Sequence, residues 1–184
     1  MSSAYLARVA RLLRHVPTTL DVAFEAPFDE AHEFAPRGPA ETDVFADALV
    51  KVELRLESFS GGLWARGRVI APWHGACRRC STSVLGLIDV RVSERFVAER
   101  GPGDEDAYLT EGDFVDLAPL VHDTILLELP LAPLCREDCR GFCPQCGIDR
   151  NEASCDCQAP IDSRWATLDG LRFTGAEPDE SNEA

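Results

Sequence analysis

Hydrophobic and charged residues alternate most regularly at residues 50–57. The apolar positions are Val50, Val52, Leu54 and Leu56, and each is followed by a charged residue. A period of two is typical of a β-strand that buries one face. This stretch therefore predicts a half-buried strand.

The same pattern continues after a turn. Residues 58–62 are rich in serine and glycine, and a second mainly apolar run follows at 63–73. The two runs predict an antiparallel hairpin. A third long strand is expected at 84–97, so Cys77 and Cys80 fall in the turn between the second and third strands.

Helical spacing appears on either side of these strands. The apolar residues of 5–16 predict a short helix, with room for a brief strand before it, and 21–25 fits an edge strand. A second helix is expected at 116–129, capped by Asp116, ended by Pro130 and buried through Leu117, Leu120, Val121 and Ile125. The segments 27–42 and 101–113 are interpreted as loops.

The net charge of the chain limits the kinds of partner that it can bind. The 184 residues include 18 basic and 32 acidic ones, which gives a formal charge of -14. Such a chain has no generic affinity for nucleic acid, but it can attract a basic protein. Arg8, Arg11 and Arg14 precede the first acidic residue, and we interpret them as a locally basic first element of the folded domain. The sequence contains no run of 18 or more apolar residues, so no membrane span is predicted.

The eight cysteines form four close pairs, at 77/80, 135/139, 143/146 and 155/157. A structural zinc ion commonly takes two thiolates from each of two short turns, so four pairs predict two zinc sites. The segment Cys143-Pro-Gln-Cys146-Gly147 is the strongest signal. We assign Cys143, Cys146, Cys155 and Cys157 to a local site, and Cys77, Cys80, Cys135 and Cys139 to a long-range one.

Other uses of the cysteines stay open. Eight is an even number, as a disulfide framework requires, although close pairs suit metal better. Rubredoxin-like iron fits the same four sulfurs, and Cys77-Arg-Arg-Cys80 could be a redox pair. The spacing of 139, 143 and 146 matches radical S-adenosylmethionine enzymes, but too little chain follows for their barrel.

These patterns together predict an α+β protein. It would have an antiparallel sheet or partly open barrel with one packed central helix and a C-terminal zinc-ribbon-like cysteine module. The expected divisions are a β-rich core at 1–134, a cysteine module packed on it at 135–158, a short helix or extended segment at 159–174, and an acidic disordered tail at 175–184.

No catalytic constellation is visible, and we expect a protein that is not an enzyme and has no small-molecule substrate. One surface could contact RNA. Aromatic and arginine side chains stack on bases and pair with phosphates, and the candidates on or after the second strand are Trp64, Arg66, Arg68, Arg78 and Arg79.

The chain resembles the eight-cysteine, actinobacterial-like form of the YceD family of large ribosomal RNA subunit accumulation proteins. The resemblance rests on the strand residues 54–58, on Cys77-Arg-Arg-Cys80, on Asp116-Leu117 and Leu129-Pro130, and on the cysteine block with Pro133-Leu-Cys-Arg-Glu-Asp-Cys139, Gly141-Phe-Cys-Pro-Gln-Cys-Gly147, Asn151-Glu152 and Cys155-Asp-Cys157. The first residues and the segment 27–42 depart most from the family pattern.

The resemblance implies a cytoplasmic role in 23S rRNA accumulation and large ribosomal subunit biogenesis, without known catalytic activity. The expected partner is a large-subunit precursor, contacted through a basic ribosomal protein or through rRNA. A thiol or iron-sulfur redox protein and a generic zinc-ribbon adaptor are the alternatives.

Overall fold

The computed structural model describes residues 4–28, 42–45, 47–157 and 164. The chain divides into two compact units, residues 1–141 and 142–184. The expectations for residues 159–174, apart from Arg164, and for the acidic tail lie outside the described residues, as does most of the loop predicted at 27–42.

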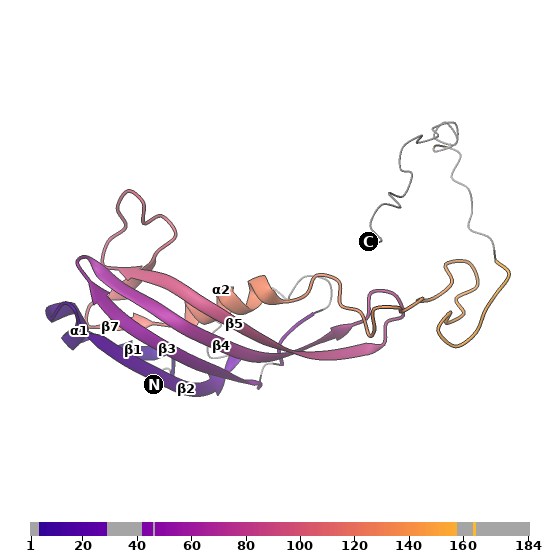
Figure 1. The fold of residues 1–184 in the computed structure, drawn as a ribbon, viewed down its shortest axis with the longest axis horizontal. Helices are drawn as coiled ribbons and strands as arrows, with labels where there is room; N and C mark the ends of the chain where they lie inside the picture. Colours follow the sequence, from indigo (N-terminus) through magenta and orange to yellow (C-terminus); the bar gives the residue numbers. More distant parts are fainter. Residues whose placement is uncertain (1–3, 29–41, 46, 158–163, 165–184) are drawn as a thin grey trace, which may run out of the picture. The chain divides into compact units, whose positions relative to one another are not determined.

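The first unit contains a seven-stranded sheet and two helices (Figure 1). The strands are ordered β1-β7-β6-β5-β4-β3-β2, and the architecture confirms the predicted α+β class. In chain order the elements are β1 (Leu6–Arg8), α1 (Ala10–Arg14), β2 (Thr19–Pro27), β3 (Leu49–Phe59), β4 (Gly62–Ala76), β5 (Ser83–Val97), β6 (Tyr108–Glu111), β7 (Phe114–Asp116) and α2 (Ala118–Glu128).

The long strands follow the predicted alternation. Val50, Val52, Leu54 and Leu56 of β3 are at most 3% exposed, while the charged residues between them face outward. The predicted edge strand is β2, which pairs with β3 along its whole length. Strands β2 to β5 form an antiparallel meander, and their inward side chains make most of the core.

Helix α2 packs against β4 and β5 through its predicted stripe. Leu117, Leu120, Val121 and Ile125 are fully buried. Asp116 is the last residue of β7, and its carboxylate accepts a hydrogen bond from the backbone N–H of Ala118, the first helical residue, at 2.9 Å. The helix ends at Glu128, two residues before Pro130.

The two edges of the sheet approach one another at Tyr5, so the sheet is nearly closed. The carbonyl oxygen of Tyr5 accepts a hydrogen bond from Leu117, beside β7, and its hydroxyl donates to Pro27 at the end of β2. Its ring also meets Phe24 edge to face, with centroids 5.3 Å apart. A single buried side chain thus joins the first and last strands of the sheet.

One local prediction needs correction. The segment 101–113 is not wholly a loop, because its residues 108–111 form β6, which runs parallel to β5 at two residue pairs. Tyr108 stacks on Phe96 of β5, with ring centroids 5.3 Å apart. The acidic composition of the segment favoured a loop and gave no indication of this contact. The segment 5–16 contains the predicted brief strand and short helix, since 6–8 pair with β7 and 10–14 are helical.

Within the described residues, no helix is both long and apolar enough to cross a membrane.

We predict that Leu120→Ala destabilises the protein strongly, whereas Leu127→Ala on the same helix does not. Leu120 is fully buried and Leu127 is 85% exposed. Truncating a buried leucine costs about 2–5 kcal/mol, and a surface change about 0.5 kcal/mol or less. Urea unfolding of the metal-loaded protein measures both free energies. Equal effects would contradict the burial of this helix face.

Candidate metal centres

The structure gathers the eight thiols into two groups of four. Within each group all four sulfurs lie within 4.8 Å of one another. The first group is Cys77, Cys80, Cys135 and Cys139, and the second is Cys143, Cys146, Cys155 and Cys157. This is the grouping that the spacing predicts.

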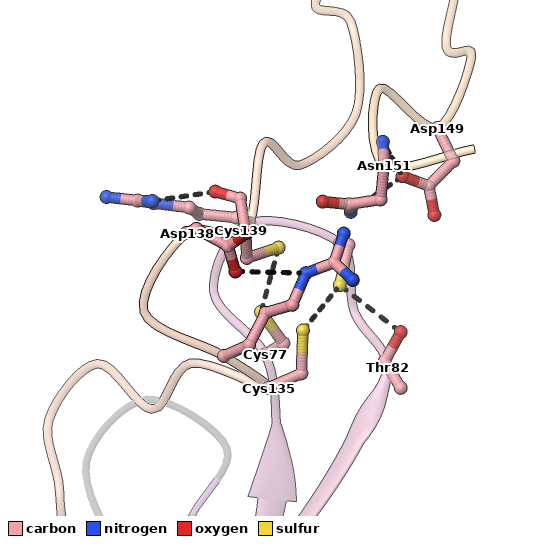
Figure 2. Close-up of polar contacts among 10 residues, drawn as sticks. Cys77, Thr82, Cys135, Asp138, Cys139, Asp149 and Asn151 are labelled. Atoms are coloured by element: carbon pink, nitrogen blue, oxygen red, sulfur yellow. Dashed lines mark hydrogen bonds and ion pairs between the residues drawn. The ribbon is translucent and has the colours of Figure 1, made fainter. Parts of the chain in front are cut away.

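The first group joins parts of the chain that are far apart in sequence. Cys77 and Cys80 lie at the tip of the β4–β5 hairpin, and Cys135 and Cys139 follow α2. Figure 2 shows the thiols converging on one point between these segments. Three of the four are buried, with the half-buried Leu134 and Val84 packed against them, while Cys135 is exposed.

Hydrogen bonds hold the two segments of the first group together. The backbone N–H of Arg78 donates to the carbonyl of Pro133. Nη1 of Arg79 donates to the carbonyl of Cys139 at 2.7 Å, a contact drawn as a dashed line to Cys139 in Figure 2. Gly141 has a φ of +66°, and a Cβ there would lie 2.5 Å from the carbonyl oxygen of Arg79. Only glycine allows this approach of the backbone.

The sulfur spacing of the first group suits a tetrahedral ion. Sγ of Cys80 is 3.5 Å from Sγ of Cys135, and Sγ of Cys77 is 3.8 Å from Sγ of Cys139. Zinc–sulfur bonds of about 2.3 Å in tetrahedral geometry place sulfurs about 3.8 Å apart. A disulfide bond needs a separation of only about 2.05 Å. The donor set therefore fits a thiophilic divalent metal.

The first cysteine pair of each group adopts the same turn. The N–H of Cys77 donates to Thr82 and that of Ser81 donates to Cys77; the N–H of Cys143 likewise donates to Ile148 and that of Gly147 to Cys143. Ser81 and Gly147 occupy equivalent positions with φ of 55° and 72°. The sequence indicates the turn segment that ends in Gly147 but not the role of Ser81, because serine rarely adopts a left-handed conformation.

The second group lies wholly in the second unit. Phe142 and Asp149 pair as an isolated bridge around the 143/146 turn. Asp149 then organises the next turn: its carboxylate accepts hydrogen bonds from the backbone and side-chain N–H groups of Asn151, as Figure 2 shows, and its carbonyl accepts from Glu152 and Ala153. This turn brings the chain back toward Cys155.

Hydrogen bonds from backbone amides lower the pKa of the first cysteine in each group. Burial raises the pKa of Cys77, but hydrogen bonds from the amides of Cys135, Arg79 and Cys80 outweigh it and lower that pKa to about 6. Amides of Cys146 and Gln145 lower the pKa of Cys143 to about 6. Amide donors stabilise the charged sulfur directly.

Another thiol in each group has the opposite pKa shift. Hydrogen bonding to Cys80 raises the pKa of Cys135 to about 12, and hydrogen bonding to Cys146 raises that of Cys157 to about 12. Four thiolates cannot crowd together without a cation to neutralise them. A metal ion would replace the protons that these thiols retain.

The RNA-contact candidates fall into two separate places. Trp64, Arg66 and Arg68 share the outward face of β4, and the Arg66 guanidinium lies 4.5 Å from the Trp64 ring centroid. Arg78 and Arg79 lie at the hairpin tip, about 40 Å away along an extended strand. They do not form one patch with Trp64.

Acidic neighbours already pair with the arginines of β4. Arg66 contacts Glu57 at 3.4 Å, and Nε of Arg68 donates to Asp89 at 2.9 Å. The sequence-based predictions did not include Arg95. This residue of β5 lies opposite Trp64 of β4, and its guanidinium carbon is 5.7 Å from the centroid of the Trp64 ring. The pairing of the two predicted strands could have placed Arg95 beside Trp64, since residues opposite one another on antiparallel strands face the same side.

Comparison with known proteins gives a consistent picture. The family model described as "Large ribosomal RNA subunit accumulation protein YceD" matches residues 65–172. The uncharacterized protein Rv2926c of Mycobacterium tuberculosis is 35% identical, covering 90% of this chain and 86% of its own length. The uncharacterized protein YlbN of Bacillus subtilis is 27% identical over 78% of this chain and 86% of its own length.

A chloroplast protein is also similar over a short region. The large ribosomal RNA subunit accumulation protein YCED homolog 1 of Arabidopsis thaliana is 30% identical over 59 residues, which are 32% of this chain and 18% of that protein. No solved structure gives a significant match.

We predict that the affinity for added zinc declines more steeply with falling pH below about 6. Protons and zinc compete for the same sulfurs, and Cys77 and Cys143 bind a proton only as the pH falls through their pKa of about 6. Each group then releases one more proton on binding, so affinity falls about tenfold more per pH unit. Competition with a chromophoric chelator measures the slope. An unchanged slope through pH 6 would contradict the predicted thiolates.

Proposed function

Because the chain belongs to the YceD family of large ribosomal RNA subunit accumulation proteins, we propose that it is a non-catalytic zinc-binding factor for 23S rRNA accumulation and large ribosomal subunit biogenesis. One observation carries the proposal. The family match spans all eight cysteines, and the fold gathers them into two groups of four thiols.

Zinc would act as a structural crosslink. Four thiolates close the coordination shell, whereas catalytic zinc sites keep one position for water. The ligands proposed for the first ion are Cys77, Cys80, Cys135 and Cys139, and those for the second are Cys143, Cys146, Cys155 and Cys157. The first site would fasten the β4–β5 hairpin tip to the segment after α2, and the second would stabilise the short segment 143–157.

A basic ribosomal protein is the partner that the chain's charge favours. A net charge of -14 repels phosphate but attracts ribosomal proteins rich in lysine and arginine. Leu85 and Leu87 project from the outward face of β5, 72% and 64% exposed, and offer apolar contacts for such a protein. Contact with rRNA through Trp64, Arg66, Arg68, Arg78 and Arg79 is the other route to the same large-subunit precursor. We place this activity in the cytoplasm.

Metal content tests the two sites. We predict two zinc ions per chain, one in Cys139→Ser and in Cys146→Ser, and none in the variant with both changes, because each substitution removes a ligand from a different group. Elemental analysis of the purified proteins counts the ions. If one substitution removed both ions, the proposed grouping would be wrong. Visible absorption that bleaches on reduction would show iron and favour the redox alternative.

Depletion tests the biological role. In cells depleted of this chain we expect less mature 23S rRNA, and free large-subunit precursors should accumulate on sucrose gradients. Re-expression of the wild type should restore both, and the Cys139→Ser/Cys146→Ser variant should not. Unchanged 23S rRNA and subunit profiles after depletion would refute the proposal.

A further inference from the structure

Residues 8–15 form a basic hollow that is part of neither the proposed metal sites nor the outward face of the sheet. A cavity of about 340 Å³ is lined by Arg8, Ala10, Arg11, Arg14 and His15. Arg8 ends β1, and Arg11 and Arg14 lie one turn apart on α1. Three arginines and a histidine thus line one concave site.

This concentration of positive charge is unusual for so acidic a chain. No acidic residue occurs before Asp21, although acidic residues outnumber basic ones by 32 to 18 overall. Arg14 forms an ion pair with Asp113, whose carboxylate lies 3.5 Å from its guanidinium group, and both side chains are well exposed. At that distance and exposure the pair contributes little. One carboxylate cannot neutralise three arginines.

Repulsion inside the hollow would be relieved by a bound anion. Like charges three residues apart on a helix destabilise it by a few tenths of a kcal/mol. Arg11 and Arg14 also gain from the C-terminal end of the helix dipole, which accounts for their place on α1 but not for Arg8 or the cavity. Guanidinium groups bind phosphate oxygens through paired N–H donors, so phosphate is the matching ligand.

The hollow also has a firm support. The carbonyl of His15 accepts a hydrogen bond from the hydroxyl of Ser58 at 3.2 Å, next to the β3–β4 turn, and the N–H of Val9 donates to the carbonyl of Asp113 at 2.8 Å. These bonds hold both ends of α1 on the sheet. The β3–β4 turn lies at the opposite end of β4 from Cys77, so the site is separate from the first cysteine group.

We propose that Arg8, Arg11, Arg14 and His15 form a phosphate-binding pocket that holds the RNA backbone. The choice of RNA as the source of the phosphate rests on the proposed function, whereas the pocket itself rests on its own geometry. Binding there would anchor RNA without reading its sequence, because phosphate contacts carry no base information. It would give an acidic protein one local point of attraction to a ribosomal precursor.

The test compares two full-length, metal-loaded variants with equal loss of charge. One replaces the pocket arginines (Arg8→Gln, Arg11→Gln, Arg14→Gln), and the control replaces exposed arginines elsewhere (Arg91→Gln, Arg100→Gln, Arg150→Gln). Circular dichroism and metal content verify that both remain folded. Fluorescence anisotropy with a short labelled single-stranded RNA measures binding at several salt concentrations, and inorganic phosphate is titrated separately by calorimetry.

We expect the pocket variant to bind RNA at least about tenfold more weakly, and the slope of log affinity against log salt to fall by about 2, because roughly three phosphate contacts are lost. The control variant should stay within about threefold of the wild type. Binding of inorganic phosphate but not of RNA, lost in the pocket variant, would support the pocket with a free phosphate compound as its ligand.

Three results would overturn the inference: no binding of either probe by the wild type, undiminished binding by the pocket variant, or equal loss in both variants. Depletion gives an independent result. If depletion lowers 23S rRNA but the pocket binds neither probe, this inference alone fails. If the pocket binds phosphate while depletion leaves 23S rRNA unchanged, the proposed function fails and the pocket stands.

Discussion

The register of the β4–β5 hairpin is the constraint on which the rest of the first unit depends. It pairs Gly62 with Val97 at one end and Ala76 with Ser83 at the other, so every residue between them has a fixed side of the sheet. A slip by one residue would turn the buried side chains to solvent. The same register puts Cys77 and Cys80 at the tip and sets Arg95 beside Trp64 on the outward face. Core, metal group and surface are therefore positioned together.

The thiol groups extend this order to segments that the sheet does not reach. Around the hairpin tip, Cys77, Cys80 and Cys139 form a small buried cluster against which the half-buried Val84 and Leu134 pack, and linking hydrogen bonds come from Arg78 and Arg79. The opposed pKa shifts within each group show that the backbone favours some thiolates, while crowding keeps other sulfurs protonated. A divalent ion would resolve this conflict, because its positive charge offsets the repulsion among all four sulfurs at once.

Charge is distributed unevenly over this acidic protein. On the outward face of β2 to β5 most arginines contact a carboxylate on the same or a neighbouring strand, and the face is close to balanced. The first segment instead gathers three arginines around one hollow, where Arg14 forms an exposed ion pair with Asp113. An anionic ligand would be attracted by such local arrangements, which the net charge of -14 does not describe.

The sequence by itself determined the strands at 50–57, 63–73 and 84–97, the buried stripe of α2 and the two sets of cysteines. These features follow from local periodicity and spacing, which neighbouring residues alone express. Only the tertiary structure decided that residues 108–111 join the sheet, that Tyr5 brings its edges together, and that Ser81 takes the place of a glycine. Each of these depends on partners far away in the chain, such as Phe96 for Tyr108 and Pro27 for Tyr5. The basic hollow depends on both the sequence and the tertiary structure. The sequence places its arginines close together along the chain, and the pairing of β1 with β7 positions them around one cavity.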